Sequence, residues 1–234
     1  MPHHPETHIR SGIDFMSYAP LFILFLVVIV VLVIAGCMQE KARRQRLAAF
    51  AALENLHYDP SRQDDPDSQY PGFDFFQRGT NRYAENFLTG TAGGCGLTAF
   101  DYHFTTGSGK NRTRHNYAVV LLRPSFLLKP LIIRPEGIWD KLTAAFGWDD
   151  IDFESAEFSR RFHVSSPDRR WAYDVLTPLT MEFLMERGKP AIHMDLLQVM
   201  LPASGSLEPD KIREAIVTGT GLLDRIPKFT RDAV

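Results

Sequence analysis

A single apolar run constrains this chain more than any other feature of its sequence. Residues 21–38 read LFILFLVVIVVLVIAGCM and carry no charged side chain. Because an α-helix rises about 1.5 Å per residue, a run of this length reaches across the hydrocarbon core of a bilayer. We therefore expect a transmembrane helix over residues 20–38, preceded by a short extramembrane segment at residues 1–19.

The charges that flank the run predict its orientation. The twenty residues before it contain one basic side chain, Arg10, whereas four follow it closely: Lys41, Arg43, Arg44 and Arg46. Short segments rich in Lys and Arg stay on the cytoplasmic side of a membrane. The sequence therefore predicts a single-pass protein of the cell membrane, with its N-terminus outside and residues 39–234 in the cytoplasm.

A second interpretation of the same run stays open. The residues Ile34-Ala35-Gly36-Cys37 resemble the lipobox of bacterial lipoproteins, in which the cysteine is lipidated and the preceding segment is removed. A lipoprotein anchored through Cys37 would carry its domain outside the cytoplasm. Three features favour the spanning helix: the N-terminal segment lacks the compact basic region that begins a signal peptide, the apolar run is long, and a basic cluster follows it.

Composition indicates a folded domain beyond the anchor and excludes some classes of function. Seventeen Phe, seven Tyr and three Trp are more aromatic residues than a disordered chain carries. A net charge of −2 gives no basic footprint for nucleic acid, so we expect no such partner. The two cysteines, Cys37 and Cys95, supply neither a disulfide framework nor a zinc cluster.

Two short segments separate the predicted anchor from the domain. Residues 39–57 are rich in strong helix formers and predict a basic juxtamembrane helix, so that residues 20–46 contact membrane lipid. Residues 58–72 include DPSRQDDPDSQ, with four Asp and two Pro, and predict a solvated acidic linker.

The order of elements predicts an α+β domain over residues 73–234, with a mainly antiparallel sheet and several helices. Strands are expected at residues 86–89, 96–106, 117–122, 131–134, 157–164 and within 191–201. Helices are expected at residues 137–146, after Ser166-Pro167-Asp168, from Thr177-Pro178 to Gly188, and from Glu208 onward.

One group of residues has the chemistry of a metal site. Asp101 and His103 lie two apart on one strand, and His115 lies across the predicted hairpin. Two histidines and a carboxylate could hold a metal ion for a membrane-tethered hydrolase, if the register brings His103 opposite His115. In a register shifted by one residue His103 faces Arg114, and the polar side of an edge hairpin accounts for the same residues.

Two further segments invite a ligand but lack the required context. The run Gly90-Thr91-Ala92-Gly93-Gly94-Cys95-Gly96 precedes a strand, whereas phosphate-binding glycine loops precede a helix, so it predicts a hairpin turn. The acidic residues Asp149, Asp150, Asp152, Glu154 and Glu157 lack the spacing of a calcium loop. We therefore expect no catalytic residue, no cofactor and no metal ion.

The segment 157–168, EFSRRFHVSSPD, is the densest feature of the domain, and residues 175–184 follow as VLTPLTMEFL. The spacing of Phe158, Phe162 and Val164 predicts that Phe162 is buried in the sheet. In these segments the chain resembles bacterial membrane-anchored proteins that carry an uncharacterised domain of unknown function, with the patterns E-F-x-R-x-F-x-V-x-S-x-D and L-x-P-x-x-M-x-x-L-L. The resemblance covers residues 150–202 and the anchor, and it implies no catalytic residue.

These observations favour binding over chemistry. We expect a single-pass, membrane-anchored binding or scaffold module that is not an enzyme. It would serve as an accessory subunit of a larger membrane assembly and contact a membrane-protein partner. The competing hypothesis is the metal-dependent hydrolase that uses Asp101, His103 and His115.

Overall fold

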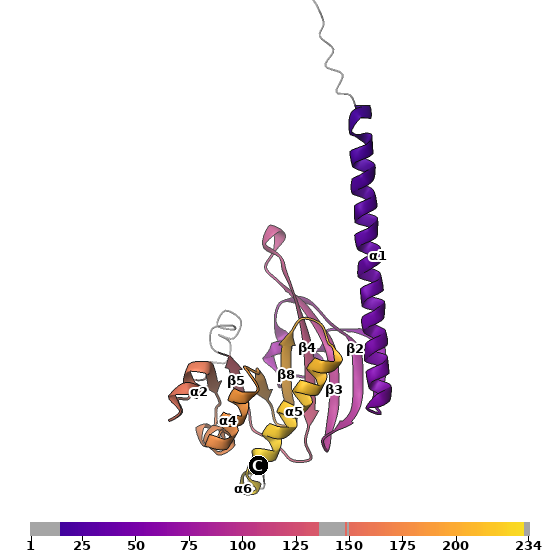
Figure 1. The fold of residues 1–234 in the computed structure, drawn as a ribbon. Coiled ribbons are helices and arrows are strands. Elements are labelled where there is room, and N and C mark those ends of the chain that lie inside the picture. Colours follow the sequence, from indigo (N-terminus) through magenta and orange to yellow (C-terminus); the bar gives the residue numbers. More distant parts are fainter. Residues whose placement is uncertain (1–14, 136–147, 149, 232–234) are drawn as a thin grey trace, which may run out of the picture. The chain divides into compact units, whose positions relative to one another are not determined.

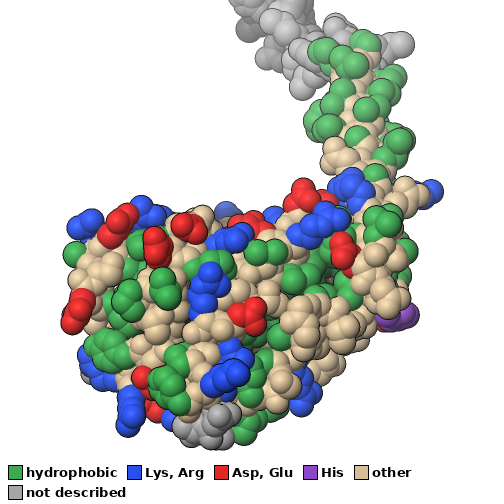
Figure 2. Space-filling view, turned by 60° about the horizontal axis from the view of Figure 1, so that its bottom comes forward, with side chains coloured by type: hydrophobic (Ala, Val, Ile, Leu, Met, Phe, Trp, Pro, Cys, Tyr) green, Lys and Arg blue, Asp and Glu red, His purple; other side chains and the backbone are tan. Residues whose placement is uncertain are grey.

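The apolar run lies inside the first helix of the molecule, α1 (Phe15–Leu53). The structure is a computed structural model that describes residues 15–135, 148 and 150–231. Side chains from Leu21 to Ile34 are exposed and form a hydrophobic column, with Lys and Arg side chains at its base (Figure 2). The helix is long and apolar enough to cross a membrane, and its most apolar stretch of 18 residues has a mean hydropathy of 3.4. The span predicted at residues 20–38 is therefore a helix of the required length and composition.

The chain forms two compact units, residues 1–43 and residues 44–234. The last turns of α1 belong to the second unit, where Leu47, Phe50 and Ala51 are buried in its core. The helix ends because Asn55 adopts a left-handed conformation with φ of 55°, and the N–H of Leu56 donates to the carbonyl of Ala51 at 2.8 Å. This hydrogen bond is the closing contact of a Schellman cap. Of the segment expected to be helical at residues 39–57, the part up to Leu53 lies in α1, and His57 begins the first strand.

An eight-stranded sheet forms the centre of the second unit (Figure 1). Every neighbouring pair of strands in it is antiparallel. In spatial order the strands are β1 (His57–Asp64), β2 (Thr80–Ala92), β3 (Cys95–Thr106), β4 (Thr113–Arg123), β8 (Val199–Ser204), β7 (Ile192–Met194), β5 (Leu131–Pro135) and β6 (Phe162–Ser165).

Helices follow the strands late in the chain, as expected for an α+β domain. They are α2 (Ala156–Arg161), α3 (Arg169–Val175), α4 (Pro178–Glu186), α5 (Pro209–Arg225) and α6 (Lys228–Arg231), with short 3-10 turns at Pro66–Ser68, Asp74–Gln77 and Gly109–Asn111. The longest, α5, crosses one face of the sheet (Figure 1). The predicted fold class is therefore confirmed.

Alternation along the central strands divides the core into two layers. In β3, Leu97 and Ala99 belong to the cluster that contains the buried residues of the helices. Phe100, Tyr102 and Phe104 point to the opposite face, where Phe73, Phe75 and Phe76 cover them. The Tyr102 hydroxyl donates to the Phe76 carbonyl at 3.0 Å. Strands buried on both faces account for the long apolar runs of β3 and β4.

The prediction of a linker at residues 58–72 is wrong over its first half. Residues His57–Asp64 form β1, which pairs with β2 as an edge strand and has an irregular register around Pro60. An edge strand exposes its outer side and tolerates charged residues and Pro, so its composition resembles that of a linker. The acidic segment therefore extends the sheet instead of separating the anchor from it.

The prediction of a continuous strand over residues 157–164 is also wrong in part. Ala156–Arg161 form helix α2, and the Ser155 hydroxyl caps it by accepting from the N–H of Phe158 at 3.3 Å. Strand β6 begins at Phe162, which is 2% exposed, so its predicted burial is confirmed. The spacing of Phe158 and Phe162 by four residues fits a helix face as well as a strand face.

The predicted start of one helix is confirmed, and the N-cap residue of another differs from the sequence-based expectation. Thr177 caps α4 with Pro178 as its first residue, as predicted. The cap of α3 is Asp168 instead of Ser166, because the Asp168 carboxylate accepts from the N–H of Trp171 at 3.0 Å. Leu179, the second residue of α4, is 72% exposed. The helix predicted at residues 137–146 lies outside the described residues.

Candidate functional site

The three residues of the predicted metal site do not converge. His103 pairs with Asn116 across the β3–β4 hairpin, and His115 pairs with Phe104. This register places His115 on the opposite face of the sheet from Asp101 and His103. Within the described residues, no group of three or more His, Cys, Asp or Glu side chains could hold a metal ion. The geometry that the hydrolase hypothesis requires is therefore not formed.

Each histidine has a local partner instead. The Nδ1 of His103 lies 2.6 Å from the Asn116 Oδ1, and its Nε2 lies 3.4 Å from the Glu85 Oε1. The His103 ring stacks on Tyr83 at 4.5 Å between ring centroids. His115 stacks on Phe104 at 4.7 Å, and its Nε2 lies 2.7 Å from the Thr106 hydroxyl.

Asp101 serves as a buried hydrogen-bond acceptor. Its carboxylate accepts from the Asn86 side-chain amide at 2.9 Å and from the N–H of Leu207 at 2.6 Å. Asn86 lies within the register irregularity of β2, has a φ of 59° and accepts from the Tyr58 hydroxyl at 2.9 Å. Buried polar groups of this kind are stabilised by complete hydrogen bonding, so the cluster fixes the fold around β2 and β3.

The glycine-rich segment forms the turn between β2 and β3, as predicted. Gly93 and Gly94 adopt positive φ values of 56° and 77°, which L side chains rarely adopt. Cys95, at the start of β3, is a buried free thiol. Burial, with a smaller contribution from Asp224, raises the pKa of the Cys95 thiol, which disfavours the nucleophilic thiolate.

The acidic stretch is divided among separate ion pairs. The Asp150 carboxylate lies 3.1 Å from the His163 Nδ1 and also accepts from the N–H of Val164 at 3.2 Å. Glu157 pairs with Arg161 one helical turn later at 2.6 Å. Asp149 lies outside the described residues. Among those that are described, the carboxylates face different partners and do not form the oxygen cage that calcium requires.

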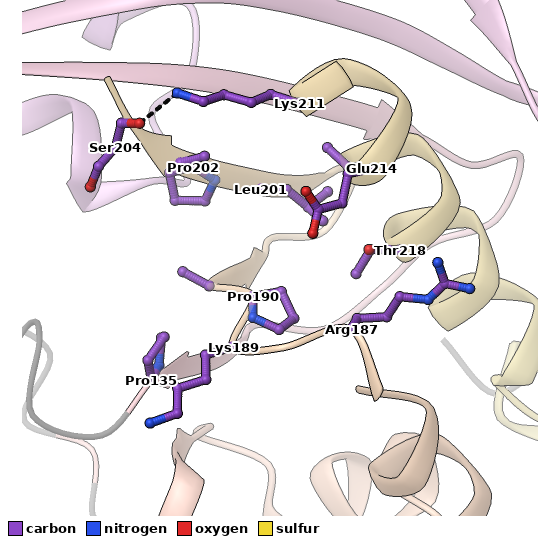
Figure 3. Close-up of a pocket in the computed structure, with 13 residues that line it drawn as sticks. Pro135, Arg187, Lys189, Pro190, Leu201, Pro202, Ser204, Lys211, Glu214 and Thr218 are labelled. Carbon is purple, nitrogen blue, oxygen red and sulfur yellow. Dashed lines mark hydrogen bonds between the residues drawn. The ribbon is translucent and has the colours of Figure 1, made fainter. Parts of the chain in front are cut away.

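A pocket of about 290 Å³ lies where β8, α5 and the segment after α4 meet (Figure 3). It forms because β7 pairs with β8 at only two positions, His193↔Met200 and Met194↔Val199. Beyond them Pro190 and Pro202 stand on the two sides of the gap, and Pro has no N–H to continue a ladder. The strands therefore separate and leave a hollow instead of closing the sheet.

The pocket has an apolar floor and a charged rim. Pro190, Leu201, Pro202 and neighbouring alanines form the floor, and Lys189, Arg187 and Glu214 stand around it (Figure 3). The Lys211 ammonium donates to the carbonyls of Ser204 at 2.7 Å and Ser206 at 3.0 Å. This combination suits an amphiphilic group, with an apolar part on the floor and a polar part at the rim.

A group of exposed leucines lies at one end of the sheet. The N–H of Leu128 donates to the carbonyl of Leu196 at 3.0 Å, so the loop after β4 lies beside the β7–β8 turn. Leu127, Leu196 and Leu197 are 46%, 56% and 44% exposed. We call these three side chains the leucine tip. They offer apolar surface on two neighbouring loops.

Sequence reasoning missed both the pocket and the leucine tip, because each depends on how distant segments meet. The signal available for the pocket was the presence of Pro190 and Pro202 near the predicted strands, which argues against continuous pairing. The signal for the tip was the pair Leu196-Leu197 between an Asp and a Gln, where a polar turn is expected.

Comparison with known protein families and with curated sequences gives no match. Among solved structures, the chain is similar to the crystal structure of the mycobacterial trehalose monomycolate transport factor A, with a TM-score of 0.58 and 12% sequence identity. The superposition covers 79% of this chain and 96% of that one. At this level of identity the likeness concerns the fold.

Proposed function

We propose that this protein is a membrane-anchored accessory module of a membrane transport assembly. It binds a membrane-protein partner and does not catalyse a reaction. Its α1 helix spans the cell membrane with the N-terminus outside, and the sheet domain lies in the cytoplasm, as the basic residues after the span favour.

The observation that carries the proposal is that the end of the anchor helix is itself a core element of the domain. Leu47 and Phe50 are 0% and 3% exposed. The Arg46 guanidinium pairs with the Glu208 carboxylate at 3.0 Å, and Arg213 lies over the Phe50 ring at 4.9 Å while pairing with Glu54 at 3.6 Å. Because the end of α1 belongs to the core of the domain, no linker follows the helix, which suits a subunit of a larger assembly.

Two further observations support the proposal. The fold resembles that of a transport factor, and this likeness of fold favours a similar role. The leucine tip offers exposed apolar surface for a partner, whereas Asp101, His103 and His115 do not share a face. An exposed apolar surface without a converging group of reactive side chains favours binding.

The test is purification of the full-length chain in mild detergent from its native membrane. We expect a stoichiometric complex with a multi-span transport protein, and we expect Leu196→Asp with Leu197→Asp to release that protein. The matched control is Leu179→Asp, which places the same charge at an exposed leucine on α4 and should keep the complex intact. A wild-type chain that purifies alone, or a complex that survives the double substitution, would contradict this proposal.

A further inference from the structure

The hairpin between β3 and β4 extends beyond its neighbours in the sheet (Figure 1). On one side, β2 pairs with β3 only as far as Thr105, and on the other side β8 pairs with β4 only from Tyr117. Strand β4 is therefore uncovered on the β8 side over residues 113–116, and the hairpin lies beyond both neighbouring strands over residues 106–113. We call residues 106–116 the arm.

The arm is basic and contains no acidic residue. Lys110, Arg112 and Arg114 lie on it and are exposed, and the chain has no Asp or Glu from residue 102 to residue 135. Within the described part of the chain, Arg112 and Arg114 have no ion-pair partner. The nearby carboxylates pair with other residues: Asp64 pairs with Arg62 at 2.8 Å, and Glu85 lies 3.5 Å from Arg44 and 3.4 Å from His103.

At the base of the arm lies a groove of about 480 Å³ lined by Arg62, Tyr83, His103, Arg112 and Arg114. Its side chains are held in place by one another. The Arg62 guanidinium lies 3.8 Å from the centroid of the Tyr83 ring, Tyr83 stacks on His103, and Arg114 donates to the Tyr83 hydroxyl. Ordered guanidinium groups with free N–H donors bind phosphate with bidentate geometry.

The chain enters the domain at the end of the sheet from which the arm projects. Arg44 lies 3.5 Å from Glu85 in β2, and Leu56 lies against Gly90, so residues 44–53 run in the same direction as β2. The start of this helical segment therefore lies toward the arm. Only five residues separate Met38 from Arg44 in the sequence, which limits how far this end of the sheet can lie from the apolar run.

We propose that the arm and its groove bind the phosphate groups of anionic lipids. The proposal rests on the membrane anchoring described above and adds a second contact with the bilayer. Lys110, Arg112 and Arg114 supply the long-range attraction to the anionic surface, and Arg62 and Arg114 beside Tyr83 supply the headgroup site. A basic residue near an anionic membrane surface changes binding by roughly fivefold.

The test places a fluorophore at the tip of the arm in the full-length chain. Ser108→Cys is labelled in a background of Cys37→Ser and Cys95→Ala, and the chain is reconstituted in nanodiscs that contain a headgroup-quencher lipid. We expect at least about threefold stronger quenching in discs with phosphatidylglycerol than in discs of phosphatidylcholine alone, and weaker quenching at high salt. A label at Ser125, at the opposite end of β4, should remain unquenched.

Two matched triple variants distinguish an effect of the arm from an effect of the total charge of the protein. Lys110→Gln with Arg112→Gln and Arg114→Gln should abolish the extra quenching. Arg169→Gln with Arg170→Gln and Lys228→Gln, which removes the same charge from exposed positions on or beside α3 and α6, should keep it. Equal quenching in both lipid compositions, retention by the first triple, or selective loss in inorganic phosphate at constant ionic strength would overturn the proposal. A chain that fails to enter the discs would instead contradict the membrane anchoring.

Discussion

The carboxylate of Asp101 in β3 accepts a hydrogen bond at 2.6 Å from the backbone N–H of Leu207, which lies 106 residues later in the chain. Leu207 directly precedes Glu208, the cap residue of α5. The same carboxylate accepts from Asn86 in β2. One buried acid therefore joins the strand irregularity of β2 to the start of the longest helix of the domain, which assigns Asp101 a structural role.

We predict that Asp101→Ala lowers the free energy of unfolding by about 2–4 kcal/mol, because it removes the acceptor of two buried hydrogen bonds. The control is Asp64→Ala, which removes an exposed carboxylate from edge strand β1 and should change it by less than about 0.5 kcal/mol. Denaturant titration of the full-length chain in micelles measures both. Equal effects of the two substitutions would show that the buried hydrogen bonds contribute little.

Phe162→Ala should cost about 3–5 kcal/mol of unfolding free energy, since it empties a buried aromatic site. Phe162 is 2% exposed and stacks on Phe158 at 4.8 Å between ring centroids. Leu179→Ala, at a leucine that is 72% exposed, should be nearly neutral. A Phe162→Ala variant with nearly unchanged unfolding free energy would mean that this part of the core repacks easily.

The packing of the end of α1 in the core can be tested with two substitutions in this helix. We expect Phe50→Ala to expose residues 44–56 to protease in the detergent-solubilised chain, because Phe50 is buried among core residues. Leu53→Ala, three residues away and 81% exposed, should leave the cleavage rate unchanged. Rapid cleavage of this segment in the wild-type chain would contradict the packing of the end of α1 in the core, on which the proposed function rests.

A buried histidine predicts acid sensitivity. Burial, assisted by Arg78 and Arg134, lowers the pKa of His193 from 6.5 to about 3. Because the unfolded chain takes up a proton below pH 6.5 and the folded chain does not, this histidine destabilises the fold progressively as the pH falls from 6.5 toward 3. The slope is at most about 1.4 kcal/mol per pH unit.

His193→Gln, which cannot titrate, removes this contribution. The difference between wild type and variant in unfolding free energy should therefore be constant above pH 6.5 and should change below it. Denaturant titrations at several pH values, with His57→Gln at an exposed position as control, measure the effect. If the unfolding free energies of wild type and His193→Gln changed in parallel with pH, His193 would not be a source of acid sensitivity.

Topology is the fifth prediction. A reporter that is active only in the cytoplasm should work when it is fused after Val234, because four basic residues follow the span. Neutral replacement of Lys41, Arg43, Arg44 and Arg46 should weaken this orientation. Metabolic labelling with a fatty acid distinguishes the alternative: an acyl chain that is lost in Cys37→Ser would identify a lipoprotein instead of a spanning helix.

Features with a local physical cause could be predicted from the sequence. The run at residues 21–38 is an apolar helix because every side chain in it is apolar, whatever the rest of the chain does. Thr177-Pro178 begins α4 because a hydroxyl and a fixed φ act within one turn. The alternation of Phe100, Tyr102 and Phe104 identified β3 because it reflects the two-residue period of a strand.

Which distant residues meet depends on the assembled sheet and could not be predicted. A shift of one residue in register moves a side chain to the other face of a sheet, so only the observed pairing of Phe104 with His115 separates His115 from His103. Composition could not distinguish β1 from a linker, because an edge strand and a linker both expose charged residues. The pocket beside Pro202 and the basic arm depend on where neighbouring strands stop pairing, a property of the assembled sheet that no single segment encodes.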